Sequence, residues 1–371
     1  MHGLSIVELM VAVALGLLIA LACSTTLVSG QRSKQVTVSV NDINLTAAFV
    51  ATSLDQMLRS AGSGFAKRGT DVFGCQVLAA RNATTILPRA SAWPAPFASL
   101  PTARRLAPIV IHAGASAGGS DVLAIMTGNS GASEAPVLVM PASATGTSVR
   151  LRNTLGLAGG DLALVAETGT GCILEQVSAG FTGGTAQTVT FDGTYAASTV
   201  SGVSLASLGQ TATTLLIPLG SATAVNRPLF QFIGVDANQT LFAYDLLQLG
   251  IEDAPSPLAE GVVELRALYG VDTNGDGTLD AWRDPSASPW TAAALTDGSS
   301  TATANLGTIV AVRVGLVLRS PLTERSSVAP ATLTLFPDLP AAVQRTYTIA
   351  TALRNQRHRT LEVSVPLRNM L

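Results

Sequence analysis

An apolar run near the amino terminus constrains this chain more than any other feature. From Leu4 to Val28 the sequence holds one charged residue, Glu8, and the run ends at Gly30-Gln31-Arg32. A bilayer is crossed by a helix of about 20 apolar residues. A secretory signal peptide would have a basic start, a shorter apolar core and a small-residue cleavage site, and the run fits none of these well. It therefore predicts a membrane-spanning helix.

Glu8, the carboxylate inside this run, is the residue most informative about function. An acidic side chain in an apolar membrane helix costs roughly 2.5 to 3.5 kcal/mol and normally persists for a function, so Glu8 needs a cationic partner. The arrangement Gly3-Leu4-Ser5-Ile6-Val7-Glu8 resembles the processing signature of type IV prepilins. The alternative is an ordinary membrane anchor that contains one stray glutamate.

This resemblance implies a defined chemistry at the amino terminus. A prepilin peptidase would remove residues 1–3 by cutting after Gly3, and it would methylate the new amino terminus at Leu4. Glu8 would then neutralise the terminal amine of a neighbouring subunit. In a low dielectric that pairing would compensate the buried charge and fix the axial register between subunits.

Two features depart from the prepilin pattern. The leader Met1-His2-Gly3 lacks the Lys or Arg that such leaders usually carry. In addition, Ala20-Leu21-Ala22-Cys23 resembles a lipoprotein cleavage box, in which Cys23 would become a lipidated amino terminus and Glu8 would be discarded. A membrane-anchored lipoprotein that serves as a binding module is therefore an alternative, although Ala20 stands where a larger aliphatic residue is usual.

The apolar run continues into an amphipathic segment that contains no proline before Pro88. One face of it carries apolar residues three or four positions apart, namely Ile43, Ala47, Val50, Leu54, Met57 and Ala61. We expect one helix from about Leu4 to Ser60, on the order of 80 Å long, with 4–30 as its membrane half, 31–62 as its amphipathic half, and Gly62 ending it. Val36–Val40 alternates like a strand, but packing of the long helix is expected to keep it helical.

The residue pattern of 63–371 is typical of a sheet-rich globular head. Short apolar runs separated by turn residues predict strands at 108–112, 122–126, 135–140, 188–191, 214–218, 229–235, 239–245, 262–271, 309–318, 346–353 and 360–366. The Ser/Thr/Ala/Gly-rich segments 193–213 and 291–303 are expected to form surface loops or short edge hairpins. The predicted fold class is α+β, a long amino-terminal stem helix packed on a β-sheet-rich globular head.

Charge and cysteine content limit the possible partners. The formal net charge is -2 with scattered Lys and Arg, so no nucleic acid is predicted as a partner. The three histidines lie far apart in sequence and no Cys/His cluster has metal spacing, so zinc and haem are not expected. Cys75 and Cys172 would form a disulfide if the head is exported, and otherwise they would be buried free thiols.

An acidic segment, 272–280, resembles a calcium-binding loop. Side-chain oxygens of Asp272, Asn274, Asp276 and Asp280, together with the Thr278 carbonyl, stand at spacings that suit a calcium ion. The segment departs from an EF-hand because Arg283 occupies the position of the bidentate glutamate and a strand precedes the loop. A solvated hairpin turn is the alternative, since Asn-Gly and Asp-Gly favour such turns.

A possible hydrolase motif lies at Gly114-Ala115-Ser116-Ala117-Gly118. A nucleophile elbow needs a helix directly after the serine, whereas Gly119-Ser120-Asp121 and a new strand follow here. We therefore expect a glycine-rich hairpin and no enzyme. His358, between Arg357 and Arg359, is expected to lie on a surface strand in a cationic neighbourhood that disfavours its protonated form.

Several segments resemble the PilW family of minor pilins. They are Leu58-Arg59-Ser60-Ala61-Gly62, Phe73-Gly74-Cys75, Ile109–His112, Gly171–Glu175, Leu268–Asp280 and the closing Val365–Met370. The resemblance implies a single-pass protein of the bacterial inner membrane with its head in the periplasm, which later moves to the pilus and the cell surface. Its expected partners are other minor pilins, the major pilin, the prepilin peptidase and a PilY-type adhesin. Calcium is the only cofactor considered.

By the same resemblance, the chain would prime pilus assembly and lie near the pilus tip, with pilus-dependent roles such as twitching motility. The chief alternative within the pilin class is a J-type minor pseudopilin of a type II secretion system. A secreted hydrolase that uses Ser116 is a more distant alternative.

Overall fold

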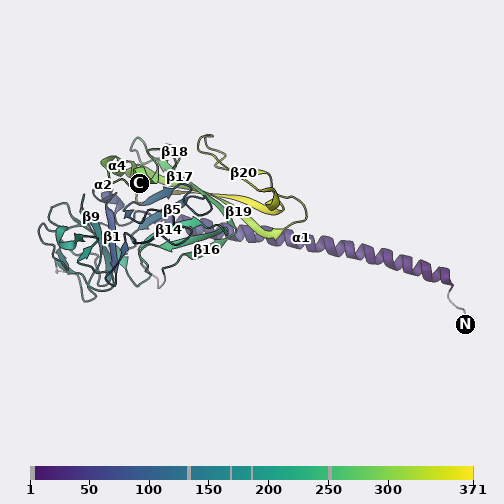
Figure 1. Cartoon of the computed structure of the whole chain (residues 1–371), viewed down its shortest axis with the longest axis horizontal. Coiled ribbons are helices and arrows are strands. Elements are labelled where there is room, and N and C mark those ends of the chain that lie inside the picture. The colour runs from purple at the N-terminus through teal and green to yellow at the C-terminus, as the bar shows by residue number, and fades with distance from the viewer. Residues whose placement is uncertain (1–4, 132–134, 168, 185–186, 250–252, 371) are drawn as a thin grey trace.

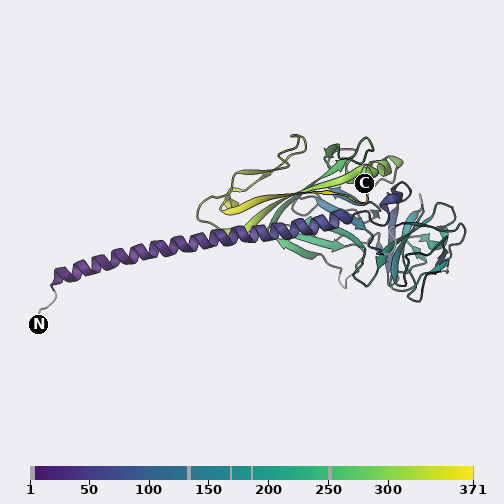
Figure 2. The ribbon, with the colours of Figure 1, turned by 180° about the vertical axis from the view of Figure 1, so that it is seen from behind.

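A computed structural model of the chain describes residues 5–131, 135–167, 169–184, 187–249 and 253–370, with the backbone alone at 28, 29, 32, 33 and 35. One long helix, α1 (Ile6–Ser60), extends from a strand-rich head (Figures 1 and 2). The predicted fold, a stem helix packed on a sheet-rich head, is confirmed. The predicted helix boundaries, Leu4 to Ser60, agree closely with those observed.

The stem stays helical through Val36–Val40 because this stretch already contacts the head. Ser39 is buried there, and its hydroxyl lies 2.6 Å from the hydroxyl of Ser320. The helix ends at Ser60, and the chain turns away at Gly62, whose φ of +79° favours glycine. A Cβ at Gly62 would also lie 3.0 Å from the Ala66 Cβ and 3.2 Å from Pro108.

The second half of the stem supplies one wall of the main hydrophobic core. Ile43, Ala47, Val50, Leu54 and Ala61 are all buried, as their spacing predicts. Leu58, which the predicted face left out, is also fully buried, and Met57 is only partly buried against the core. Because burying one such side chain stabilises by roughly 1.5 to 3 kcal/mol, the stem cannot be separated from the head without loss of the fold.

Two antiparallel sheets pack along this half of the stem. The five-stranded sheet has the order β16-β15-β14-β5-β4, and the four-stranded sheet has the order β18-β17-β19-β22. Their bounds are β4 (Ile109–His112), β5 (Val122–Thr127), β14 (Leu229–Val235), β15 (Thr240–Asp245), β16 (Ser256–Glu260), β17 (Val262–Val271), β18 (Ala281–Arg283), β19 (Ile309–Thr323) and β22 (Gln356–Pro366). We call these two sheets, with the second half of α1, the stem-side part.

A seven-stranded sheet lies at the end of the head away from the amino terminus (Figures 1 and 2). Its order is β2-β1-β9-β8-β13-β6, with β3 paired to β1, and β1 runs parallel to β9. Its strands are β1 (Gln76–Arg81), β2 (Thr84–Leu87), β3 (Arg104–Arg105), β6 (Val137–Leu138), β8 (Asp161–Glu167), β9 (Gly171–Gln176) and β13 (Leu215–Ser221). We call this sheet, with the segments that cover it, the distal lobe.

Short elements complete the head. The two-stranded sheets are β7 (Ser148–Arg150) with β10 (Thr188–Thr190), β11 (Thr199–Val200) with β12 (Val203–Ser204), and β20 (Thr332–Leu335) with β21 (Arg345–Thr348). The short helices are α2 (Gly69–Val72), α3 (Ala292–Leu295), α4 (Ser300–Gly307), η1 (Ala66–Arg68), η2 (Leu205–Ser207) and η3 (Thr351–Leu353).

The core is divided by the seven-stranded sheet. One hydrophobic cluster joins the stem, the stem-side sheets and the inner face of the distal sheet, which includes Leu164 and Cys172. A second cluster, with Val165 and Ile173, lies on the outer face of that sheet under β10, β11 and the loops around them. A third, smaller cluster surrounds Phe336 on the far side of β17 and β19.

The strand predictions succeed best where apolar β-branched residues dominate. The predicted strands 229–235 and 262–271 match β14 and β17 residue for residue. The predicted loop 291–303 is wrong, because it forms α3 and the start of α4, whose first turn is capped by Ser299 accepting from the Ala302 N–H. The predicted strand 346–353 is β21 followed by η3, and β1, β8 and β9 were missed.

Candidate functional site

The amino-terminal end of the stem is the first candidate site. Gly3 and Leu4, the predicted cleavage and methylation residues, lie outside the described residues. Ser5 caps α1: its hydroxyl accepts from the Val7 N–H at 3.3 Å, and Glu8 Oε2 accepts from the Ser5 N–H at 3.1 Å. Glu8 therefore closes its own helix end in the single chain, a capping-box role that the sequence reading did not consider.

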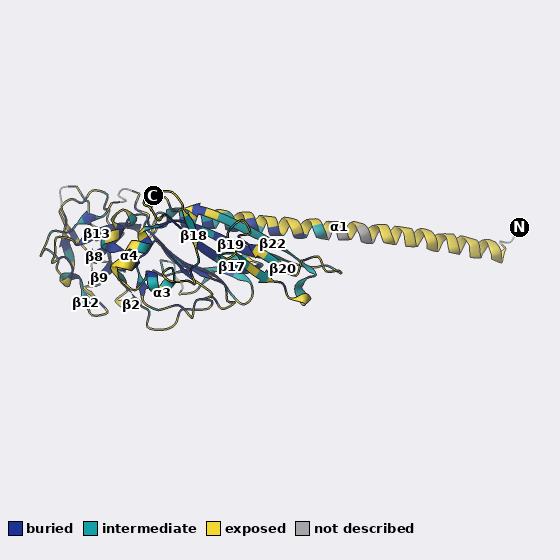
Figure 3. Cartoon of the chain, turned by 90° about the horizontal axis from the view of Figure 1, so that it is seen from above, coloured by how far each residue is buried: buried dark blue, intermediate teal, exposed yellow. Residues whose placement is uncertain are grey.

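The first half of the stem has no contact with the head. Ile6–Leu27 has a mean hydropathy of 2.7 and none of it is buried, so its side chains form an exposed apolar cylinder (Figure 3). By length and composition this segment is able to cross a membrane. Glu8 is exposed on it, and within the described chain it forms no ion pair.

The outward face of the second half is also partly apolar. Leu45 is 70% exposed, Phe49 53% and Val38 50%, although Phe49 and Val38 each directly precede a buried residue. Exposed large apolar side chains on a helix favour contact with another surface. The stem thus has one face in the head and a second face that is free in the single chain.

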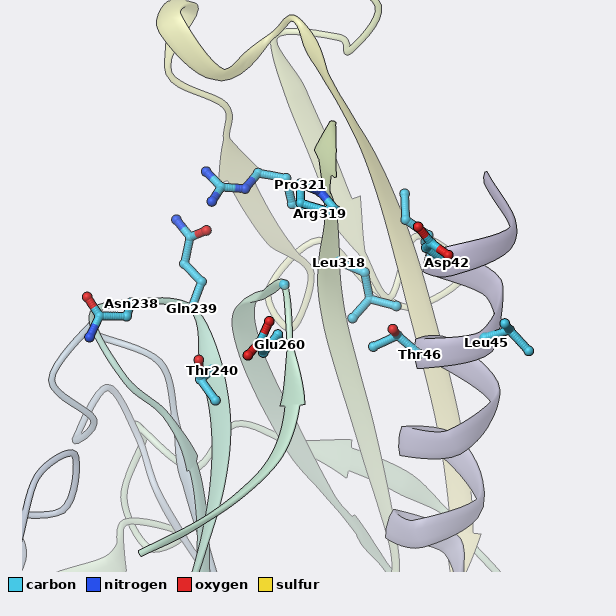
Figure 4. Close-up of a pocket in the computed structure, with 12 residues that line it drawn as sticks. Asp42, Leu45, Thr46, Asn238, Gln239, Thr240, Glu260, Leu318, Arg319 and Pro321 are labelled. Atoms are coloured by element: carbon cyan, nitrogen blue, oxygen red, sulfur yellow. The ribbon is translucent and has the colours of Figure 1, made fainter. Parts of the chain in front are cut away.

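A pocket of about 600 Å³ opens where the stem meets the two stem-side sheets (Figure 4). Asp42 and Thr46 of α1 line one side of it, and Gln239 and Glu260 line the opposite side. Arg319 extends away from α1 toward the Gln239 side of the pocket. Its charged lining is of mixed sign, with Asp42 and Glu260 as acids and Arg319 as the base.

Cys75 and Cys172, the predicted pair, form a disulfide in the structure, with their Cα atoms 5.9 Å apart. Cys75 directly precedes β1, and Cys172 lies in β9 opposite Val77. The bond therefore joins the chain that leaves the stem to the centre of the distal sheet. Cys23, the residue of the lipoprotein alternative, is a free and exposed cysteine on the stem.

The carboxylates of the acidic loop accept hydrogen bonds from the loop's own backbone and side chains. Asp272 is buried and accepts from the N–H groups of Gly275 at 2.6 Å and Gly277 at 2.7 Å. Asp280 accepts from the Thr273 N–H at 2.7 Å, and Asp276 accepts from Thr278. Where the structure describes the chain, no three acidic, histidine or cysteine side chains converge as metal ligands.

These carboxylates thus hold their own loop, which joins the ends of β17 and β18. Calcium binding by Asp272, Asn274, Asp276, Thr278 and Asp280 stays a prediction.

Ser116 lies in the turn between β4 and β5, as the hairpin interpretation predicts. It is buried, and its hydroxyl donates to the carbonyl of Val235. His112, four residues earlier, is held at 2.8 Å from the guanidinium of Arg104, and burial beside that cation lowers the pKa of His112 to about 3. The Ser116 hydroxyl is therefore used as a structural donor.

His358 is half-buried rather than fully on the surface. Its Nδ1 lies 2.9 Å from the Gln356 carbonyl oxygen, and burial, with a smaller contribution from Arg319, lowers its pKa. The expected disfavoured protonation is thus present, with burial as the main cause. Arg319, rather than the flanking arginines, is the cation that contributes to it.

Two buried carboxylates of the distal lobe escaped the sequence reading. Glu175 at the end of β9 is 1% exposed and accepts from the Ala197 N–H at 3.1 Å, while its other oxygen has no partner. Burial raises the pKa of Glu175 to about 8. Glu167 is also buried and accepts from the Gly209 N–H at 3.1 Å. An acidic residue that ends an apolar run, as in Cys172-Ile173-Leu174-Glu175, was the available signal.

Comparisons with known proteins found one family model and one solved structure that are similar to parts of this chain. The family model of type IV pilus-assembly protein W, PilW, matches residues 232–369. That range covers most of both stem-side sheets from β14 onward, and it is less than half of the chain. No curated protein matches the chain.

A type IV-like pilin from Thermus thermophilus is similar in structure at 13% identity and a TM-score of 0.22, over 58% of this chain and 87% of that one. At that TM-score, nothing about function is drawn from the likeness. The match to the family model and the geometry of the stem are what bear on function.

Proposed function

From the match of residues 232–369 to the PilW family model, we propose that this chain is a minor pilin of the type IV pilus. The observation that carries the proposal is the stem. One unbroken helix has a first half that is apolar, contains a carboxylate and touches nothing, and a second half that is built into the core of the head. Such a molecule can be anchored in a membrane and then packed among neighbouring helices.

In this proposal the stem anchors the protein in the bacterial inner membrane with its head in the periplasm. A prepilin peptidase cuts after Gly3 and methylates Leu4, and Glu8 pairs with the terminal amine of a neighbouring subunit. Removing Glu8 from water is costly unless a cation meets it, and a terminal amine in the same apolar layer supplies that cation. Other minor pilins, the major pilin and a PilY-type adhesin are the proposed partners, and priming of assembly near the tip is the proposed role.

The amino terminus provides the direct test. Intact mass and amino-terminal sequencing of protein from cells with and without prepilin peptidase should show a methylated Leu4 only when the peptidase is present. An intact leader, or lipid on Cys23, would contradict the proposal. Deletion of this chain separates the two pilin-class roles. If the deletion abolishes piliation and leaves secretion intact, the pilus is supported, whereas the reverse result supports the J-type pseudopilin of a secretion system.

Two variants separate the two roles of Glu8. Glu8→Gln keeps an oxygen that can accept from the Ser5 N–H but removes the charge, whereas Glu8→Ala removes both. If the charge pairs with a terminal amine, piliation should be lost in both variants. Full piliation of Glu8→Gln would show that Glu8 acts only as a helix cap. Asp42→Ala is the matched control, because Asp42 is an exposed acid of the same helix outside the apolar span.

A further inference from the structure

The end of the head nearest the amino terminus is strongly basic. We define the basic tip as residues 319–331 and 349–359, which hold five arginines and one acidic residue, Glu324, in a chain whose formal net charge is -2. The arginines are Arg319, Arg325, Arg354, Arg357 and Arg359. The acidic loop 272–280 carries charge of the opposite sign, with three aspartates and no basic residue.

Backbone hydrogen bonds join the two segments of the basic tip. The Glu324 N–H donates to the Asn355 carbonyl at 2.7 Å, the Val328 N–H donates to the Arg354 carbonyl at 2.8 Å, and the Ile349 N–H donates to the Ala331 carbonyl at 2.9 Å. The end of β19 and the start of β22 carry these segments toward the amino-terminal end of α1 (Figures 1 and 2). The arginines are therefore held together at the end of the head that faces the apolar span.

Little acidic charge offsets these arginines. Glu324 pairs with Arg357 at 2.6 Å, which neutralises one of them. Arg359 donates to the Asn44 side chain of the stem, and Arg354 donates to the Ile349 carbonyl at 3.2 Å, so both keep their charge. Among the described residues Arg319 and Arg325 form no ion pair, and Arg325 is exposed.

Other charged groups face this end from neighbouring elements. Asp42 of the stem and Glu260 of β16 line the pocket at the base of the head with Arg319. Lys34, also on the stem, adds a positive charge between the head and the apolar span. The balance of charge at this end of the head remains positive.

The stem fixes the height of the basic tip above a membrane. From Leu27, the last residue of the apolar span, to Ser39, which contacts Ser320, the helix rises twelve residues, or about 18 Å. The headgroup layer of one leaflet takes up roughly 5 to 8 Å of that distance. A Debye length is about 8 Å at physiological salt, and an ordinary helix tilt of about 20° brings one side of the head closer.

A small pocket beside the basic tip combines apolar and cationic lining. It has a volume of about 200 Å³ and lies between the stem and the tip. Val40, Ile43 and Val328 line it together with Arg357 and Arg359. Guanidinium groups bind phosphate oxygens through paired hydrogen bonds, and the apolar lining tolerates a glycerol or acyl stem.

We propose that the basic tip binds the anionic phospholipid headgroups of the membrane in which the stem is anchored. The inference rests on the proposed membrane anchoring of the stem. Binding would hold the head against the membrane surface while the subunit is stored there. Extraction of the stem into a filament would then have to break these contacts.

The test uses the full-length protein in nanodiscs made of zwitterionic lipid alone or with added phosphatidylglycerol. Hydrogen exchange of residues 324–331 and 349–355 is followed by mass spectrometry. An arginine near an anionic surface contributes enough attraction to change binding roughly fivefold, so we expect at least a tenfold slowing of exchange in anionic discs. High salt should abolish the slowing.

A double variant and a matched control complete the experiment. Arg319→Gln with Arg325→Gln removes two of the four tip arginines that form no ion pair with a described residue, and the slowing should then be mostly lost. Arg150→Gln with Arg152→Gln changes two exposed arginines of the distal lobe and should leave the slowing intact. Thermal unfolding of each variant checks that the head stays folded.

Equal exchange in both lipid compositions would overturn the proposal, as would slowing that survives in the tip variant. Slowing that needs an acidic partner protein instead of lipid would also overturn it. The amino-terminal mass of the same sample reports peptidase processing without reference to lipid. Failure of lipid binding and failure of the proposed pilin function are therefore distinguishable.

Discussion

The stem-side part and the distal lobe bury carboxylates in different ways. In the stem-side part Asp121 receives the N–H groups of Gly114 and Ala267, each at 2.9 Å, and it also pairs with Arg266 at 3.1 Å. In the distal lobe Glu175 receives a single N–H, from Ala197, and forms no ion pair with any described residue. Burial raises the pKa of both groups, but two amides and a cation oppose the rise at Asp121.

The difference follows from what covers each sheet. The stem-side sheets are covered by a helix and by each other, so long side chains from neighbouring strands can meet, as Asp121 and Arg266 do. The outer face of the distal sheet is covered by short strands and loops, whose free groups are backbone amides. Such amides need acceptors when they are buried, and Glu175 and Glu167 supply them. The distal lobe should therefore depend more on covalent and pH-sensitive contacts than the stem-side part does.

The largest expected effect is loss of the disulfide. Cys75 and Cys172 are separated by 97 positions in the sequence, and closing a loop of about 100 residues stabilises by about 4 to 5 kcal/mol in the chain-entropy model. We expect the double variant Cys75→Ala/Cys172→Ala to lose most of this stability in urea unfolding. Hydrogen exchange should rise first in β1 and β9. Equal loosening of β19 and β22 would break the distinction between the two parts.

The stem provides the next largest effect. Leu54 is fully buried at the centre of the main core, so Leu54→Ala should destabilise the protein by about 3 to 4 kcal/mol. Leu45→Ala is the matched control, because Leu45 lies on the same helix with 70% of its surface exposed, and it should change stability by less than about 0.5 kcal/mol. Urea unfolding followed by circular dichroism measures both. Similar losses in the two variants would contradict the two-faced stem.

The sequence predicts those parts of the fold that are set by residues close together in the chain, and it fails where distant segments decide the structure. The stem was predictable because its apolar spacing repeats over many turns, and β14 and β17 were predictable because β-branched and aromatic residues fill them. Helix α4 was not, since five of its eight residues are Ser, Thr, Asn or Gly, which are weak helix formers, and its start depends on the Ser299 cap. The basic tip unites segments about 30 residues apart, which no local pattern shows.

The candidate site residues were likewise predictable where residue type and nearby sequence suffice, and not where the tertiary structure decides their role. Glu8 and the cysteine pair were visible because each depends on residue type and a known context. The amide N–H groups that donate to Asp272 and the buried position of Glu175 depend on the tertiary structure. The sequence singled out Asp272 only as a possible calcium ligand, and it gave Glu175 no role of its own. The capping role of Glu8 lay within four residues and could have been read from Ser5-Ile6-Val7-Glu8.

A smaller effect should come from the pH dependence of Glu175. Because its pKa is raised from 4.5 to about 8 in the folded chain, the folded state binds the proton more tightly than the unfolded state does. Stability from this group is therefore complete below about pH 4.5 and is lost as the pH rises through 8. Between pH 6 and pH 9 we expect the free energy of unfolding to fall by about 2 to 3 kcal/mol.

The variant Glu175→Gln tests this directly, since glutamine keeps an acceptor for the Ala197 N–H without a titrating proton. Its stability should fall less between pH 6 and pH 9 than that of the parent chain. An unchanged pH profile would show that Glu175 is not the group responsible. Hydrogen exchange at pH 9 should be fastest in the segment around Ala197 if the distal lobe loosens locally.

The smallest effect is expected from an exposed ion pair of the stem, and it sharpens the contrast with the buried pair of Asp121 and Arg266. Asp55 and Arg59 lie 2.5 Å apart one helical turn from each other, with side chains 35% and 40% exposed. Exposed pairs of this spacing stabilise by about 0.3 to 0.5 kcal/mol, so Asp55→Asn should cost no more than that. A double-mutant cycle with Arg59→Gln isolates the coupling. A coupling above about 1 kcal/mol would mean that exposure does not decide which charges stabilise the stem-side part.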